Sequence, residues 1–256
     1  MVSRNALAGL SLTDYARLGL SKSGLHTTIS IRYPGIERRP FKVRFNNVWR
    51  QIENGTWEAK QIAKVIRFSR PGQTLVDLGA WVGPYSLLFA HLVSPSGIVY
   101  AFEPDPVARE ELIFNLKINN LQNVKVIPKC VGDYDGLAIL KSNRPGNSVS
   151  SISRYGDEKV KWSETVDIVT LDSYFSSRQA IHGIKIDVEG SELEVLIGAR
   201  KLLRQFRPWV LCEYEGQYQK DLAGQLKMLA QIKSELGECE EIDIEPNGKT
   251  ILFAGN

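Results

Sequence analysis

The sequence predicts an α/β fold: a seven-stranded, mostly parallel sheet with helices on both faces, preceded by a small N-terminal accessory region. From residue 73 onward, compact apolar segments alternate with helical patterns, which is typical of βαβ units. Right-handed crossovers between parallel strands place helices on both faces of such a sheet. The chain then ends with two short alternating segments around Pro246-Asn247-Gly248-Lys249, which predict an antiparallel pair.

Residues 1–70 are expected to form the accessory region, and residues 71–256 the main domain. Alternating apolar residues indicate strands in the first of these, and turn residues separate the elements. The expected elements are a short helix within 1–20, strands over 27–33 and 41–45 around a turn at Pro34–Gly35, and a helix over 57–70 that Pro71–Gly72 closes.

The main domain is expected to hold seven strands, over 74–79, 97–104, 123–132, 183–189, 208–214, 240–245 and 250–255. The helices expected between them cover 84–93, 106–120, 192–206 and 225–237. The part between 133 and 182 is less regular. Two further strands are expected there, over 136–140 and 165–175, with a loop rich in Ser, Gly and Asn between them.

The composition is that of an ordinary globular domain, with 43% hydrophobic residues, 24% charged residues and a net charge of +3. This charge is too small to indicate a specific nucleic-acid partner. Its distribution is uneven, because residues 1–50 hold nine Lys and Arg against two acidic residues. Two interpretations stay open: a solvated basic face, or a lobe that meets an anionic substrate, polymer or membrane surface.

Three cysteines lie far apart without CxxC pairing, which favours a reducing compartment. Asp14 and Arg17 interrupt the first apolar segment before it reaches the length of a signal peptide or a membrane span. We therefore expect a cytoplasmic protein without a membrane span. The oligomeric state stays open.

The stretch VDLGAWVG, residues 76–83, joins the first main strand to its helix. Gly79 and Gly83 let the backbone turn tightly and approach a ligand closely. Glu103 ends the next strand, where an acidic side chain can bind both hydroxyls of a ribose. A dinucleotide fingerprint would need three glycines and a P-loop would need GK[ST], and neither is present. Asp77 suits a cofactor with a cationic amino-acid end, which indicates S-adenosylmethionine.

The chain resembles the class I S-adenosylmethionine-dependent methyltransferases and, among them, the FkbM family. The matching segments are VDLGAWVGPYSLLFA (76–90), YAFEPDP (100–106), NNLQNVKVIPKCVGD (119–133), TLDSYF (170–175), IKIDVEGSELEVLIGARKLL (184–203) and PWVLCEYE (208–215). The resemblance implies a Rossmann-like sheet with the last strand reversed and O-methylation of sugar or natural-product hydroxyls. One departure is Trp81, which stands where an Asn is common.

The resemblance also implies roles for individual residues. Glu103 would bind the ribose hydroxyls, and Asp133 would face the adenine amino group. The residues that would line the methionine and ribose end are Asp77, Gly79, Ala80 and Gly83.

Alternation in IKIDVE, residues 184–189, sends Lys185, Asp187 and Glu189 to one face of a strand at the ligand-binding edge. Asp187 could orient an acceptor hydroxyl, accept its proton or contact the methionine amine. Glu189 is the second candidate base. Glu213 could contact the substrate or pair with Lys185, and Lys185 could also pair with Asp187 or Glu189.

Two further features of this stretch concern local structure and metal binding. Ser191 and Glu194 have the spacing of a capping box, which would fix the start of the next helix. A divalent metal on Asp187 and Glu189 is compatible with the sequence but not required by it.

The resulting hypothesis is an S-adenosylmethionine-dependent O-methyltransferase acting on a small-molecule or glycan acceptor, such as a sugar, a glycolipid or a secondary metabolite. Two alternatives stay open. One is a nicotinamide-dependent oxidoreductase, and the other is a non-catalytic cofactor-binding module of the same fold.

Overall fold

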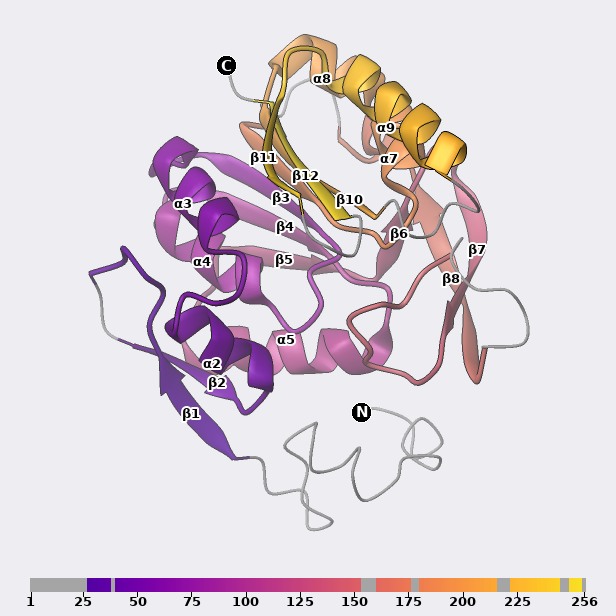
Figure 1. Ribbon diagram of the computed structural model, residues 1–256. Coiled ribbons are helices and arrows are strands. Elements are labelled where there is room, and N and C mark those ends of the chain that lie inside the picture. The colour runs from indigo at the N-terminus through magenta and orange to yellow at the C-terminus, as the bar shows by residue number, and fades with distance from the viewer. Residues whose placement is uncertain are drawn as a thin grey trace.

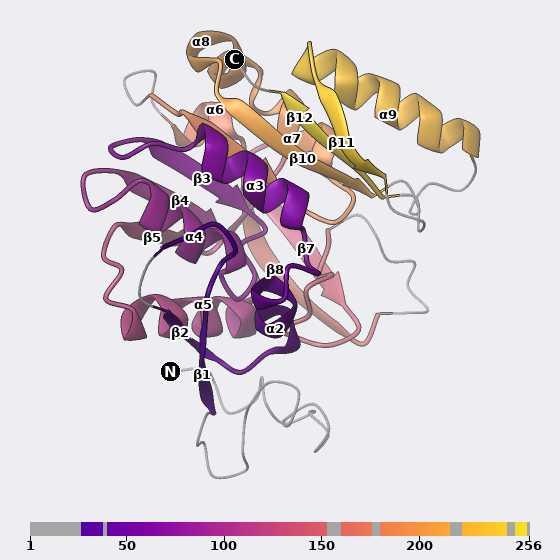
Figure 2. The ribbon, with the colours of Figure 1, turned by 60° about the vertical axis from the view of Figure 1, so that its left-hand side comes forward.

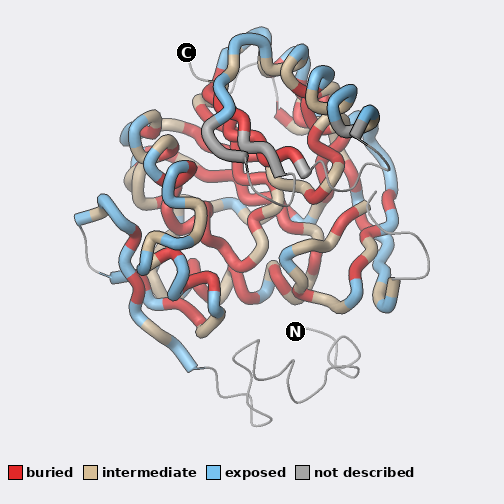
Figure 3. Tube along the Cα trace, viewed as in Figure 1, coloured by how far each residue is buried: buried red, intermediate tan, exposed pale blue. Residues whose placement is uncertain are grey.

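The computed structural model describes residues 27–37, 40–152, 160–175, 180–215, 222–244 and 249–254. The helix expected within 1–20 and most of the expected turn at 246–249 lie outside these ranges. Within them, a central sheet is covered by helices on both faces, and the most deeply buried residues follow the sheet (Figures 1 and 3).

The central sheet has seven strands in the order β5-β4-β3-β9-β10-β12-β11. Their bounds are β3 Thr74–Leu78, β4 Ile98–Phe102, β5 Val124–Ile127, β9 Gly183–Ile186, β10 Trp209–Glu215, β11 Glu240–Ile244 and β12 Lys249–Ala254. Strand β12 is antiparallel to both β10 and β11, whereas β5, β4, β3, β9 and β10 are parallel to one another. The seven strands and the reversed last strand confirm the predicted sheet. The reversed strand lies between β10 and β11, so β11 forms the edge.

The two faces of this sheet have separate hydrophobic cores. On one face Leu75 of β3 and Leu211 of β10 pack with helices α3 (Ala59–Phe68), α4 (Pro84–Leu92) and α5 (Pro106–Ile118). On the other face Val76 and Ile184 pack with α6 (Leu171–Tyr174), α7 (Glu192–Ile197), α8 (Arg200–Phe206) and α9 (Leu222–Leu236). Asp77 and Lys185 follow the residues of the second core by one position, so they point to the first face.

A second sheet, in the order β6-β8-β7, corrects two of the expected strands. Its strands are β6 Lys129–Val131, β7 Gly136–Ser142 and β8 Trp162–Val169. The strand expected over 123–132 divides into β5 and β6, because Pro128 has no N–H to donate to a ladder. The strand expected over 165–175 ends at Val169. Thr170 then caps α6, where its Oγ1 accepts a hydrogen bond from the Ser173 N–H at 3.0 Å.

The region after β9 also differs from the prediction. Strand β9 ends at Ile186, so Asp187 and Glu189 lie in the loop that follows it. The helix expected over 192–206 breaks at Gly198, which lies against the Gly132 carbonyl so closely that a Cβ would come within 2.0 Å of it. Ser191 precedes α7 but makes no side-chain capping hydrogen bond. The Gly190 N–H instead donates to Glu192 Oε1 at 2.8 Å.

The N-terminal region packs on the main domain and shares the first core (Figure 2). It contains the expected hairpin of β1 (Thr28–Ile31) and β2 (Phe41–Arg44). A helix that was not predicted, α2 (Asn47–Glu53), follows the hairpin. The side chain of Asn46 caps α2 by accepting a hydrogen bond from the Val48 N–H at 3.2 Å. The boundary expected at residue 70 stays a prediction, since this region and the sheet share one core.

Asn115 on α5 joins the N-terminal region to the loop between β3 and α4. Its Oδ1 accepts a hydrogen bond from the Arg44 N–H at 2.8 Å, and its Nδ2 donates to the Val82 carbonyl at 3.0 Å. The side chain is fully buried. Asn115→Ala should therefore lower the free energy of unfolding by about 2–3 kcal/mol, because it leaves a buried donor and a buried acceptor unpaired. Asn119→Ala, which removes hydrogen bonds to Lys42 at the surface, should cost less than half as much in the same urea titrations. Equal losses of unfolding free energy in the two variants would show that the burial of Asn115 does not increase the cost of removing its hydrogen bonds.

Candidate functional site

Two adjoining cavities open at the C-terminal ends of β3, β4 and β9, where ligands bind in open α/β sheets. The Glu103 cavity holds about 590 Å³ and the Lys185 cavity about 920 Å³, including space open to solvent. Both volumes are in the range of small-molecule sites. The two cavities share the wall residues Gly79, Trp81, Ser148, Asp187 and Glu189. The two cavities therefore adjoin at the same edge of the sheet.

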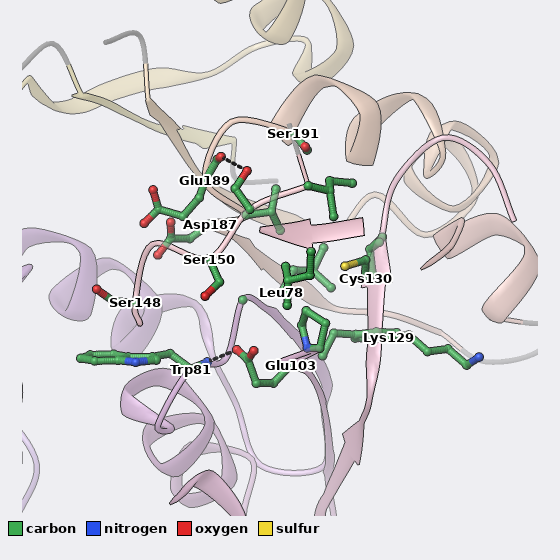
Figure 4. Close-up of a pocket in the computed structure, with 18 of the residues that line it drawn as sticks. Leu78, Trp81, Glu103, Lys129, Cys130, Ser148, Ser150, Asp187, Glu189 and Ser191 are labelled. Atoms are coloured by element: carbon green, nitrogen blue, oxygen red, sulfur yellow. Dashed lines mark hydrogen bonds between the residues drawn. The ribbon is translucent and has the colours of Figure 1, made fainter. Parts of the chain in front are cut away.

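Glu103 follows the end of β4, and its side chain is buried in the wall of the first cavity (Figure 4). Its Oε2 accepts a hydrogen bond from the Trp81 N–H at 2.7 Å, and its Oε1 accepts one from the Asp105 N–H at 2.8 Å. Burial raises the pKa of Glu103 to about 8; the neighbouring Asp105 carboxylate adds to this rise, and the two N–H donors oppose it. The carboxylate is thus held in one orientation at the place predicted for a ribose-binding residue.

The walls of the Glu103 cavity are otherwise largely apolar. Phe102 and Pro104 come from the end of β4, and Val131 and Ile152 come from the part of the chain around the second sheet. Apolar walls of this kind suit the faces of an aromatic ring. The amine of Lys129 points away from the acidic residues of the cavity (Figure 4) and pairs with Asp167 at 2.5 Å.

The loop over 145–151 covers this cavity, and Asp105 and Trp81 fix it. Asp105 Oδ2 accepts hydrogen bonds from the Gly146 N–H at 2.7 Å and from Ser150 Oγ at 3.3 Å. The indole Nε1 of Trp81 donates to the Gly146 carbonyl at 3.2 Å. No role in the site was predicted for Asp105 from the sequence. Asp before Pro at the start of a helix was a signal for a helix cap, a role that Asp105 also has at α5.

Gly79 is required by the close approach of two loops. Its φ is +75°, and a Cβ at this position would lie 1.9 Å from the Asp187 carbonyl oxygen. Ala80 follows it in the wall of the Lys185 cavity. Gly83, which was predicted to line the cofactor site, has a different surrounding. A Cβ there would meet Leu112 at 2.7 Å and Leu87 at 2.8 Å, so Gly83 allows α4 and α5 to pack.

Lys185 lies at the centre of a buried charge cluster. Its side chain is 4% exposed, and its Nζ donates to Asp187 Oδ2 at 2.8 Å. The amine also lies over the ring of Tyr85, 5.0 Å from the centroid. Burial acts to lower the pKa of Lys185, but the attraction of Asp187, Glu213, Asp77 and Glu58 prevails and raises it above its usual value. Lys185 is therefore positively charged and neutralises several carboxylates.

Asp77 is the neighbour of Lys185 across the β3–β9 pair and is fully buried. Its Oδ2 accepts a hydrogen bond from Ser86 Oγ at 2.6 Å, whereas its Oδ1 has no hydrogen-bond partner within the described ranges. Burial raises the pKa of Asp77, against the lowering effect of Lys185 and Ser86. Buried polar atoms are usually hydrogen-bonded, so Asp77 Oδ1 is an exception among them.

Glu189 takes a left-handed backbone conformation, with φ of +58°. Its carbonyl oxygen accepts a hydrogen bond from Ser151 Oγ at 2.7 Å (Figure 4). The side chain lies in the wall of both cavities, close to Asp187 in the loop after β9. Non-glycine residues in this conformation are concentrated at functional sites, and Trp81 and Glu58, with φ of +47° and +46°, also line the Lys185 cavity.

The structure does not bring every predicted residue to the cavities. Asp133 is exposed and is not in the described walls of these two cavities; it lines an adjoining hollow that shares Ile152 and Ser191 with the Glu103 cavity. Glu213 is fully buried on β10 and acts on Lys185, but it is not part of either cavity wall.

The N-terminal region supplies the outer wall of the Lys185 cavity through Asn46, Asn47, Gln51, Trp57 and Glu58. No sequence motif marked these residues. The basic side chains counted in this region do not contribute to the described wall, where Lys185 is the basic residue. This wall gives no support to an anionic substrate at the N-terminal region.

The described ranges contain neither a metal-binding group nor a membrane-spanning helix. No group of three or more His, Cys, Asp and Glu side chains is arranged to hold a metal ion. No helix combines the length and apolarity needed to cross a membrane.

Comparison with known proteins assigns the chain to a family. Residues 77–240 match the model of the methyltransferase FkbM domain, which is more than half of the chain. The protein belongs to the FkbM methyltransferase family. This FkbM chain is 30% identical over 154 residues to the methyltransferase sdnD of Sordaria araneosa, a match that covers 48% of the chain and 59% of that relative. The chain thus matches less than two thirds of the relative's length.

The fold of this FkbM protein is shared by a solved structure. A proposed rRNA methylase from Clostridium thermocellum superimposes with a TM-score of 0.50 at 13% identity, over 76% of this chain and 92% of that one. The methyltransferase FkbM from Methylobacillus flagellatus gives a TM-score of 0.48 at 17% identity, over 82% of this chain and 55% of that one.

Proposed function

We propose that the protein is an S-adenosylmethionine-dependent methyltransferase that methylates a hydroxyl group of a sugar, a glycolipid or a secondary metabolite. The observation that carries the proposal is the Glu103 cavity. It places a buried, oriented carboxylate beside the Gly79 turn, at the carboxyl ends of adjacent parallel strands. The family match supports methyl transfer and gives no support to a nicotinamide-dependent oxidoreductase.

The residues present fit this cofactor. The apolar walls formed by Phe102 and Val131 suit the adenine ring, and Glu103 suits the ribose hydroxyls. Asp77 Oδ1, buried without a partner in the described part of the chain, suits a charged donor at the amino-acid end. When bound, the cofactor would supply a methyl group on a positively charged sulfur. Asp133 lines a hollow that adjoins the Glu103 cavity at Ile152 and Ser191, so its contact with the adenine amino group stays a prediction.

On the acceptor side, the chain offers two carboxylates in the loop after β9. Lys185 fixes Asp187 in the cavity wall through its 2.8 Å hydrogen bond, and the 145–151 loop fixes the Glu189 backbone through Ser151. Asp187 in this position is suited to orient an acceptor hydroxyl and to accept its proton. Glu189 is the alternative base. Glu213, behind Lys185, would act through Lys185 and not on the acceptor.

The decisive test is methyl transfer from cofactor labelled in the methyl group, with glycans, glycolipids and small polyols as acceptors and mapping of the labelled atom. Calorimetry should show binding of S-adenosylhomocysteine and no comparable binding of NAD. Tight binding of NAD alone would refute the proposal. If the Asp187→Ala variant bound the cofactor normally and its biological effect in cells persisted, the alternative of a non-catalytic cofactor-binding module would be favoured.

The pKa of Glu103 makes ligand affinity dependent on pH. Ribose hydroxyls donate hydrogen bonds, so they bind the ionised carboxylate better than the protonated one. Because the pKa of Glu103 without ligand is about 8, only a minor part of it is ionised at pH 7. The dissociation constant of methylthioadenosine, which has the ribose but no titrating amino acid, should therefore fall about tenfold from pH 7 to pH 9. Glu103→Gln should bind more weakly and show no such change; a wild type without pH dependence would contradict the assignment.

A further inference from the structure

We propose that Glu58, in the N-terminal region, binds the ammonium group of the cofactor's amino-acid end. This inference rests on the proposed function. Glu58 lies outside residues 77–240, the part of the chain that matches the family model. The methyl donor's binding site would thus be completed by a residue of the accessory region.

The first support is the position of Glu58. It immediately precedes α3, and its side chain lines the Lys185 cavity together with Asp77 and Ala80, the residues predicted for the amino-acid end. The ribose site at Glu103 is in the adjoining cavity, and Gly79 and Trp81 belong to both walls. A ligand with its ribose at Glu103 therefore extends past Gly79 toward Glu58.

The second support is that the carboxylate is held in place. Tyr85 Oη donates to Glu58 Oε2 at 2.7 Å, and the Glu58 carbonyl accepts a hydrogen bond from the Ile62 N–H at 2.9 Å. Burial raises the pKa of Tyr85 and the Glu58 carboxylate adds to the rise, so Tyr85 keeps its proton and stays a donor. The backbone of Glu58 is left-handed, which is uncommon for a residue with a side chain. Tyr85 is thus a positioning residue for Glu58.

The third support is the charge of the cavity. Its described wall contains the carboxylates of Glu58, Asp77, Asp187 and Glu189 and one basic side chain, Lys185, whose amine already binds Asp187. Carboxylates in a cavity wall are suitable acceptors for an ammonium group. Asp77 Oδ1 adds an independent observation, because it is a fully buried acceptor without a partner within the described ranges. An ammonium has three protons to donate, and Asp77 and Glu58 are acceptors on the same wall.

The test compares two ligands that differ at the amino-acid end. S-adenosylhomocysteine carries the ammonium, whereas methylthioadenosine has the same adenosine and no amino acid. We expect Glu58→Gln to weaken binding of S-adenosylhomocysteine about tenfold or more by calorimetry, and to change binding of methylthioadenosine less than about twofold. Tyr85→Phe should give a smaller effect of the same selectivity. Glu53→Gln is the matched control, because Glu53 lies in the same region and pairs with Arg50 at the surface.

Each outcome decides the question. Wild-type protein that binds neither ligand would overturn the proposed function and this inference with it. Wild-type protein that binds S-adenosylhomocysteine, with an unchanged affinity in Glu58→Gln, would overturn only the role of Glu58. Equal weakening of both ligands would also overturn it, because Glu58 would then act on the fold or on the adenosine site. Thermal unfolding of each variant separates a loss of binding from a loss of folding.

Discussion

Gly79→Ala is expected to lower the free energy of unfolding by more than about 3 kcal/mol and to abolish measurable binding of S-adenosylhomocysteine. Two effects add at this position. The left-handed φ of +75° strains any residue with a Cβ, and the new methyl group would lie 1.9 Å from the Asp187 carbonyl oxygen. Backbone cannot move aside as a flexible side chain can. The loops after β3 and β9 must therefore separate, and this displaces both Ala80 and Asp187 from the cavity wall.

Gly237→Ala is a matched control for this prediction. Gly237 has almost the same φ, +77°, and a Cβ there would meet nothing within 4 Å. Its cost should be limited to the conformational strain, about 1–2 kcal/mol, with ligand binding unchanged. Urea unfolding and calorimetry of both variants then isolate the collision with Asp187. If the two variants were equally destabilised, the close contact of the two loops would have no energetic importance.

The sequence predicted the parts of this site that depend on periodicity and on strand order. Asp77 and Lys185 point to the same face because each is one position out of step with the apolar residues of its strand, and β3 and β9 are direct neighbours. Glu103 could be placed for the same reason, since it follows the next parallel strand. The rule of alternation stops where the strand ends. Glu189 was assigned by alternation to a strand, but β9 ends at Ile186, and the left-handed backbone of Glu189 directs it by loop geometry.

The remaining differences come from contacts between segments far apart in the chain. Glu58 meets Tyr85 because the N-terminal region packs on α4, and no local pattern specifies that packing. Strand β6 leaves the central sheet after Pro128 and still supplies Cys130 and Val131 to the Glu103 cavity, whereas Asp133 beyond it lines the adjoining hollow. Gly83 was correctly expected at a tight turn, but the close neighbour that requires glycine is α5.

The largest loss of stability among the charged residues is expected for Lys185→Met, at about 3–5 kcal/mol near pH 7. Met keeps much of the side-chain volume and removes the charge, so buried carboxylates lose the cation that stabilises them. Asp187 loses its 2.8 Å hydrogen bond, and Asp77 and Glu213, both fully buried, lose its attraction. Arg200→Met, which breaks a surface pair with Glu235, should cost far less.

The dependence of this loss on pH identifies its cause. Burial already raises the pKa of Asp77 in the folded protein, and removal of Lys185 takes away an effect that lowers it. A carboxyl group with a raised folded pKa binds a proton on folding, so its contribution to stability falls as the pH rises above the unfolded value. The difference in unfolding free energy between wild type and Lys185→Met should therefore be largest at neutral pH and should shrink as the pH is lowered toward 5. A difference that is constant over this range would show that Lys185 contributes through packing against Tyr85 and not through its charge.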